Sequence, residues 1–136
     1  MKQALLDTDT ISYYFRNQTA VVEKVDKYLQ EYGFINLSVV PYYEIMNGLL
    51  FKDAKRQLTL FETFSELNSI IPLHKSTAKL AADIYSQLRK KGITIGHNDI
   101  MIAACAIENN LTLVSNNTNH FQHIENLEID NWSLYA

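Results

Sequence analysis

Apolar residues occur along the chain in two patterns, short continuous runs and longer stretches with helical spacing. Short runs rich in β-forming residues predict buried strands, and they lie at Ala4–Leu6, Phe34–Val40, Ser69–Leu73, Thr112–Ser115 and, as a last edge strand, Leu127–Ile129. Apolar residues that recur every three or four positions predict helices, and they lie at Ile11–Arg16, Thr19–Tyr32, from Pro41 onward, Lys55–Leu67, Lys75–Lys91, Asn98–Asn109 and, as one turn, Asn119–Gln122.

Glycine and proline mark several of these boundaries. Gly33 follows the second predicted helix, where a left-handed residue commonly ends a helix, and Pro41 suits the first turn of the helix it opens. Strands that alternate with helices predict an α/β fold, namely a three-layer α/β/α domain with a mostly parallel central sheet. Neither a repeat nor a linker interrupts residues 1–136, so we expect a single domain.

The composition is that of an ordinary globular protein, with 47% hydrophobic and 20% charged residues among 136. No stretch approaches the roughly 18 apolar residues that a membrane span needs, so we expect no membrane partner. The start is not that of a signal peptide. The single cysteine, Cys105, lies in an apolar run and is expected to be a buried free thiol. A disulfide framework is thereby excluded, and we expect a cytoplasmic protein.

Basic residues do not dominate the chain. The net charge is −3, whereas affinity for a nucleic-acid backbone comes from Lys and Arg. Two local clusters remain open to either interpretation, as solvated helix ends or as phosphate contacts: Lys52, Lys55 and Arg56, and residues 89–91. Carboxylates that gather in one pocket and bind cations would also make the working surface more positive than the total charge implies.

Three acids share one topological position. Asp7 directly follows the first strand, Glu44 lies about one turn into the helix after the second strand, and Asp99 opens the helix before the last core strand. Because crossover connections are right-handed and ligands bind at the carboxyl ends of parallel strands, these three side chains are expected at the same edge of the sheet. Each acid alone could equally be an ordinary helix cap or first-turn acid.

Three carboxylates brought together repel one another unless a positive charge compensates them. A hard divalent cation does so with oxygen ligands, and magnesium typically takes one or two carboxylates and keeps several waters. Such a site suits phosphodiester hydrolysis, because the cation polarises the phosphate, lowers the pKa of the attacking water and stabilises the leaving oxygen.

Four motifs resemble, in their order, those of PIN-domain ribonucleases and, more narrowly, those of the VapC toxins of prokaryotic type II toxin–antitoxin pairs. They are Leu5–Thr8, Ser38–Glu44 with Gly48 behind it, Ile95–Ala104 and Leu113–Asn117, and the resemblance continues to Phe121 and Ile129–Trp132. It implies a PIN-like fold and an endoribonuclease that uses Mg²⁺ or Mn²⁺.

The resemblance also implies site residues and partners. Asp7, Glu44 and Asp99 match the family's acidic metal-binding positions, and many PIN domains carry a fourth acid where this chain has Asn116 and Asn117. These amides are expected to help catalysis by holding a water or the cation. The implied partners are RNA, a cognate VapB-like antitoxin whose arm enters the acidic cleft with an Arg or Lys, and a second copy in a homodimer.

Two other functions fit the sequence. The stretch Asp7–Thr10 matches the D-x-D-x-T start of haloacid-dehalogenase-like phosphatases, in which Asp7 would be the nucleophile and Asp9 the acid/base group. Those enzymes also need a positioned lysine and a later acidic pair, which residues 96–99 imitate poorly. The other alternative is a catalytically inactive PIN-like binding module.

Several histidines and tyrosines lie near these motifs, and the histidines are not expected to bind a metal. His120 and His123 have the spacing of one helical turn but no third ligand, so we expect surface histidines, and we expect His97 in a loop. Tyrosines near the predicted cleft could stack on bases or belong to the core or an interface: Tyr13, Tyr14, Tyr42 and Tyr43.

Overall fold

The computed structural model describes residues 1–134, which contain a five-stranded sheet with the order β3-β2-β1-β4-β5. Every pair of neighbouring strands is parallel, so the sheet is parallel throughout rather than mostly so. The strands are short: β1 (Ala4–Leu6), β2 (Asn36–Ser38), β3 (Ser69–Ile71), β4 (Thr112–Val114) and β5 (Ile129–Asp130).

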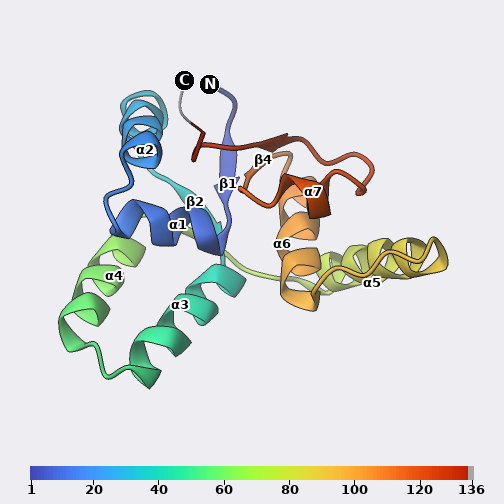
Figure 1. The fold of residues 1–136 in the computed structure, drawn as a ribbon, viewed down its shortest axis with the longest axis horizontal. Coiled ribbons are helices and arrows are strands. Elements are labelled where there is room, and N and C mark those ends of the chain that lie inside the picture. Colours follow the sequence, from blue (N-terminus) through green and yellow to red (C-terminus); the bar gives the residue numbers. More distant parts are fainter. Residues whose placement is uncertain (135–136) are drawn as a thin grey trace.

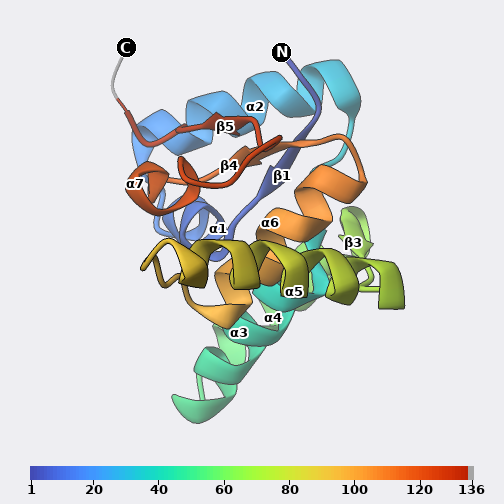
Figure 2. The same cartoon turned by 90° about the vertical axis from the view of Figure 1, so that its right-hand side faces the viewer.

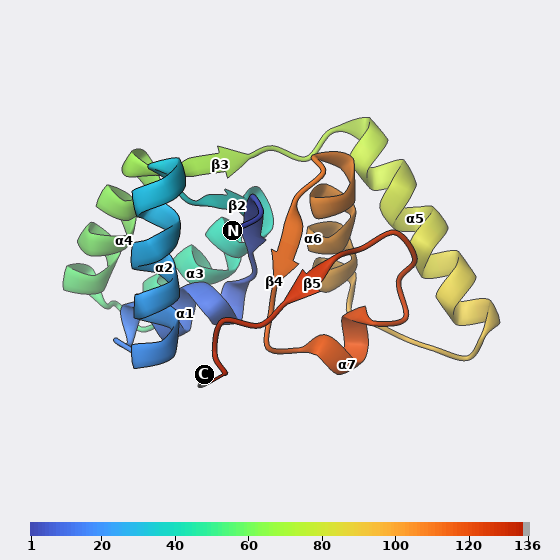
Figure 3. The ribbon, with the colours of Figure 1, turned by 90° about the horizontal axis from the view of Figure 1, so that it is seen from above.

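Helices cover both faces of this sheet, which confirms the predicted three layers (Figure 3). They are α1 (Thr8–Phe15), α2 (Thr19–Tyr32), α3 (Val39–Phe51), α4 (Lys55–Leu67), α5 (Lys75–Lys90), α6 (His97–Glu108) and α7 (Thr118–Phe121). Helices α2 and α4 lie on one side of the sheet and α5 and α6 on the other. The α3–α4 hairpin extends beyond the sheet (Figure 1), and α3 contacts both α1 and α6.

The alternation of side chains along β1 divides the interior into two cores. Leu5 packs with the apolar residues of α5 and α6, whereas Ala4 and Leu6 point the other way and pack with those of α1 and α2. All three are at most 1% exposed. The tyrosine Tyr28 of α2 closes the second core, where its hydroxyl accepts a hydrogen bond from the backbone N–H of Ala4 at 3.0 Å.

Helices α1 and α3 begin two or more residues earlier than the sequence predicts, and in each case a polar side chain caps the helix. Asp7 accepts a hydrogen bond from the N–H of Thr10 at 2.9 Å, so α1 begins at Thr8 rather than at Ile11. Ser38 accepts one from the N–H of Val40 at 3.3 Å, so β2 ends at Ser38 and the β-branched pair that follows is helical. Glu44 consequently lies in the second turn of α3.

The last strand is also displaced from its predicted position. β5 begins at Ile129, where this residue pairs with Leu113 of β4, and not at Leu127. The short helix α7 begins one residue earlier than predicted, at Thr118.

The carboxyl ends of the strands lie at the end of the sheet from which α3 and α4 extend, while the amino terminus lies at the opposite end (Figures 1 and 2). Leu6 of β1 and Val114 of β4 are direct partners in the ladder, so the residues that follow them leave the sheet side by side. No helix within residues 1–134 has the length and apolar character to cross a membrane.

Candidate functional site

Asp7 is a buried carboxylate fixed at the end of β1. Its side chain is only 5% exposed, and its Oδ1 caps α1 through the N–H of Thr10. Burial raises the pKa of Asp7 above its ordinary value, while hydrogen bonds from Ser115 and Thr10 act in the opposite direction. The hydroxyl and amide donors stabilise the charged carboxylate, but burial outweighs them and the pKa is raised.

Asp99 lies in the first turn of α6 and faces the same acids. Its pKa is raised first by burial and then by the charges of Asp7, Glu44 and Asp9, while His120 lowers it. The structure therefore brings together the three acids that the sequence singled out.

Glu44 approaches this cluster from α3. Its Oε1 accepts a hydrogen bond from the hydroxyl of Thr8 at 2.7 Å, which ties the second turn of α3 to the first residue of α1. The side chain is half-buried, whereas Asp9 is exposed. Four carboxylates thus converge from β1, α1, α3 and α6, and we define Asp7, Asp9, Glu44 and Asp99 as the carboxylate cluster.

The side chains of the two asparagines after β4 have different hydrogen-bond partners. The amide nitrogen of Asn116 donates to the hydroxyl of Tyr13 at 2.8 Å, and the amide of Asn117 lies 2.8 Å from Nδ1 of His120. The backbone N–H of Asn117 also donates to Ser115 Oγ at 2.9 Å. Both predicted amides therefore have protein partners at the border of the cluster.

Two residues beside the cluster were missed from the sequence. Ser115, which is fully buried, hydrogen-bonds Asp7, and the pairing of Leu6 with Val114 would have indicated it once β1 and β4 were taken as neighbours. His120 is exposed, as expected, but its contact with Asn117 and its effect on Asp99 were not foreseen, because they depend on how α7 folds back after β4.

The structure also places His97, Tyr42 and Tyr43, which the sequence set near the predicted cleft. His97 is the first residue of α6 and not a loop residue, and its ring stacks on Tyr85. Tyr42 packs against Phe61 at the core, while Tyr43 is 62% exposed.

No Lys or Arg side chain forms an ion pair with the cluster within residues 1–134, where the ion pairs are Met1 with Glu31 and Lys2 with Glu128, although His120 lowers the pKa of Asp99. In the same part of the chain, no three His, Cys, Asp or Glu side chains are arranged as a complete metal site. The donor set nevertheless fits magnesium, which takes oxygen ligands and needs only one or two carboxylates besides water and phosphate.

A groove of about 480 Å³ opens beside the cluster, between α1, α3 and α4. Thr8 and Glu44 line it where it meets the cluster, and Arg16 and Lys52 supply positive charge. Its walls are largely apolar and include Phe15, Ile45, Leu49, Leu60 and Phe61. The groove therefore joins an acidic site to an apolar surface.

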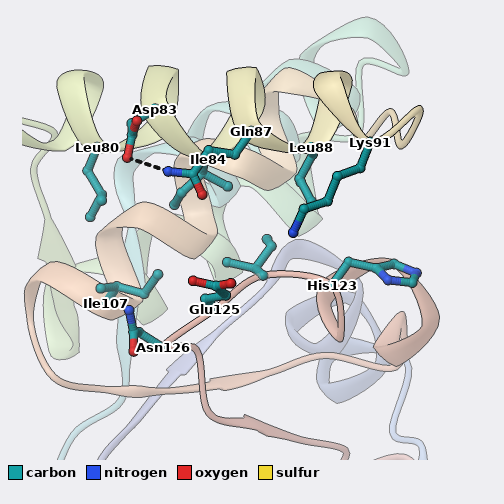
Figure 4. A pocket seen from close by; sticks show the side chains of 11 residues that line it. Leu80, Asp83, Ile84, Gln87, Leu88, Lys91, Ile107, His123, Glu125 and Asn126 are labelled. Carbon is teal, nitrogen blue, oxygen red and sulfur yellow. Dashed lines mark hydrogen bonds between the residues drawn. The ribbon is translucent and has the colours of Figure 1, made fainter.

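A second, smaller cavity is separate from the cluster. It has a volume of about 120 Å³ and lies between α5 and the segment 123–126 (Figure 4). Leu80 and Ile84 point into it from α5, and none of the four carboxylates lines it. The cluster and its groove are accordingly the candidate functional site.

Comparisons with known proteins agree with this geometry. The sequence profile of the PIN domain matches residues 4–127. The chain is similar to Ribonuclease VapC2 of Haemophilus influenzae, with 29% identity over 97% of this chain and 99% of that protein. It is also similar to the tRNA(fMet)-specific endonuclease VapC of Shigella flexneri, with 26% identity over 98% of this chain and 100% of that one.

The fold has a close counterpart among solved structures. VapBC2 from Rickettsia felis, crystallised bound to a DNA fragment from its promoter, contains a chain with a TM-score of 0.85 and 27% identity, covering 95% of this chain and 98% of that one. The family match includes the carboxylate cluster, which lies within residues 4–127, and the named relatives are nucleases rather than phosphatases. The chain belongs to the PIN domain family.

Proposed function

We propose that the protein is a metal-dependent endoribonuclease and the toxin of a toxin–antitoxin pair, acting in the cytoplasm. The observation that carries the proposal is the carboxylate cluster, in which burial and mutual repulsion raise the pKa of Asp99 more than His120 lowers it. A site that concentrates negative charge without a Lys or Arg ion-pair partner favours a cation. The named activities of the relatives, ribonuclease and tRNA endonuclease, give the substrate class.

Asp7, Glu44 and Asp99 would hold Mg²⁺ or Mn²⁺. When bound, the cation would supply Lewis acidity, polarising a phosphate oxygen and lowering the pKa of the attacking water. Asp7 stays oriented through Thr10 and Ser115, and Glu44 through Thr8. In metal sites generally, removing such a supporting hydrogen bond lowers metal affinity or activity by roughly 10- to 100-fold.

Asn116 and Asn117 would act at the border of the cluster. The amide nitrogen of each makes the bond to Tyr13 or to His120, so the amide oxygen is free to accept a hydrogen bond from a water or an RNA hydroxyl, or to bind the cation. Attack by water in line with the leaving oxygen should leave a 5′-phosphate and a 3′-hydroxyl.

The antitoxin would occupy the groove beside the cluster. Its apolar walls suit an apolar segment, and Glu44 at its inner end suits an Arg or Lys that replaces the cation. The crystallised neighbour from Rickettsia felis is itself a VapBC complex, which supports a partner of this kind. We also propose a homodimer, because α3 exposes Tyr43, Leu50 and Phe51, the last at 91%.

The test is cleavage of total tRNA by antitoxin-free protein, with Mg²⁺ and with EDTA. Asp7→Asn and Asp99→Asn should abolish cutting, whereas Asp26→Asn, an exposed acid on α2, should leave it unchanged. Discrete metal-dependent cuts that vanish in both cluster variants are expected. Cutting that survives either cluster variant would refute the assignment of the site, and a parent that cuts no RNA with Mg²⁺ or Mn²⁺ would refute the proposal and favour an inactive binding module.

A further inference from the structure

A stack of planar side chains lies beside the carboxylate cluster and has no part in the proposed hydrolysis. The ring of His97 stacks on that of Tyr85, with centroids 4.6 Å apart and an angle of 26° between their planes. Arg89 places its guanidinium carbon 5.7 Å from the centroid of the same tyrosine ring. We define His97, Tyr85 and Arg89 as the stacking platform.

The platform is held rigidly by the packing of two helices. Tyr85 and Arg89 are one turn apart on α5, and His97 opens α6, which packs along α5. Tyr85 is half-buried and packs against the core formed by α5 and α6. His97 is exposed, so one face of its ring is covered by Tyr85 and the other is open to a ligand.

Positive charge borders the platform. Arg89 and Lys90 are both exposed, and together with Tyr85 and Ser86 they line an open hollow of about 380 Å³. Neither cation belongs to an ion pair in the part of the chain that the structure describes. An exposed ring with unpaired cations beside it is the arrangement by which proteins hold a single strand, since bases stack on the ring and phosphates contact the cations.

The platform and the cluster share the amino end of α6. His97 precedes Asp99 by two positions, which is roughly 3 Å of rise along the helix, although the two side chains leave different sides of the helix. A strand with its scissile phosphate at the cluster must cross this first turn to reach the platform. Gly96, which precedes the helix, is exposed, and open space surrounds the place where a side chain would stand.

We propose that His97, held by Tyr85, stacks on a nucleobase of the RNA next to the cleaved bond, while Arg89 and Lys90 contact its phosphates. His97 touches the substrate directly, whereas Tyr85 is a positioning residue that acts through His97. This inference rests on the proposed ribonuclease function. It adds a binding site for the RNA strand, which the metal ligands alone do not provide.

The test compares steady-state cleavage of a short single-stranded RNA by the parent, His97→Ala and His97→Phe. Loss of one stacked base should raise KM about 5- to 150-fold with little change in kcat, and His97→Phe should restore the parent KM because it keeps an aromatic face. Phe34→Ala removes another exposed aromatic ring, 47% exposed, at the other end of the sheet, and is the matched control.

An abasic RNA separates stacking from a structural effect. If His97 stacks on a base, His97→Ala loses its effect when that base is removed from the RNA, and Tyr85→Leu behaves like His97→Ala. Arg89→Ala should lower the salt dependence of binding by about one phosphate contact, whereas Lys79→Ala, farther back on α5, should not.

The outcomes are distinct. A parent that cuts no RNA refutes the proposed function and this inference with it. A parent that cuts while His97→Ala matches Phe34→Ala, or loses equally on intact and abasic RNA, refutes the stacking proposal alone. A KM effect that is rescued by phenylalanine and absent on abasic RNA supports it.

Discussion

Replacing Asp7 by asparagine should make the metal-free protein more stable while abolishing cleavage. Asparagine keeps the oxygen that caps Thr10 and removes the charge of a residue that is only 5% exposed. Each unit by which burial raises the pKa of Asp7 corresponds to about 1.4 kcal/mol of unfavourable free energy for the charged form. The stability of Asp7→Asn in EDTA should therefore exceed that of the parent at pH 7.

Asp7→Ala distinguishes the cap from the charge. Alanine removes both, and it leaves the buried N–H of Thr10 without its acceptor. We expect Asp7→Ala to be less stable than Asp7→Asn by about 1 to 3 kcal/mol, or roughly 4 °C in melting temperature for each kcal/mol. Urea unfolding in EDTA measures both differences.

The pH dependence of the free energy of unfolding tests the same prediction independently. The pKa of Asp7 is raised above 3.8 in the fold, so the folded state binds its proton more tightly than the unfolded state does. The parent must then lose stability as the pH rises from 3.8 through the raised pKa, and Asp7→Asn must lose less. The reasoning is refuted if Asp7→Asn is less stable than the parent in EDTA at pH 7, or if the parent and Asp7→Asn show the same pH dependence.

Three further variants or reagents test particular contacts. Ser115→Ala removes a hydrogen bond to Asp7. It should raise the Mg²⁺ concentration needed for half-maximal cleavage about 10- to 100-fold, as measured by metal titration. Burial and Glu108 raise the pKa of the Cys105 thiol to about 11, so iodoacetamide at neutral pH should modify it only after unfolding, as followed by mass spectrometry. Phe61→Ala, at a side chain that is 1% exposed, should lower the free energy of unfolding by about 3 to 5 kcal/mol in denaturant titrations, and a loss below 1 kcal/mol would contradict its place in the core.

The order of elements and the gathering of acids could be predicted because they depend on local pattern and on one rule of topology. Asp7 follows an apolar run and Asp99 precedes one, and parallel strands bring such ends to one edge. The length of β2 could not be predicted in the same way. Val39 and Val40 favour a strand by propensity, and only the Ser38 cap and the packing of α3 make them helical.

The rest of the site depends on contacts between segments far apart in the sequence. The bond from Ser115 to Asp7 exists because β4 pairs with β1, and His120 approaches Asp99 because α7 folds back after β4. Likewise, the stack of His97 on Tyr85 needs α5 to pack along α6. None of these pairs leaves a periodic or motif signal in one sequence.

The most direct test of the central claim is the anomalous scattering of Mn²⁺ soaked into crystals of the antitoxin-free protein. The account predicts a peak coordinated by carboxylate oxygens of Asp7, Glu44 or Asp99, absent in Asp99→Asn crystals, for a protein that cuts RNA with the same metal. RNA cleavage by protein whose crystals hold no metal at the cluster, or hold it only at another site such as the cavity near His123, would contradict it.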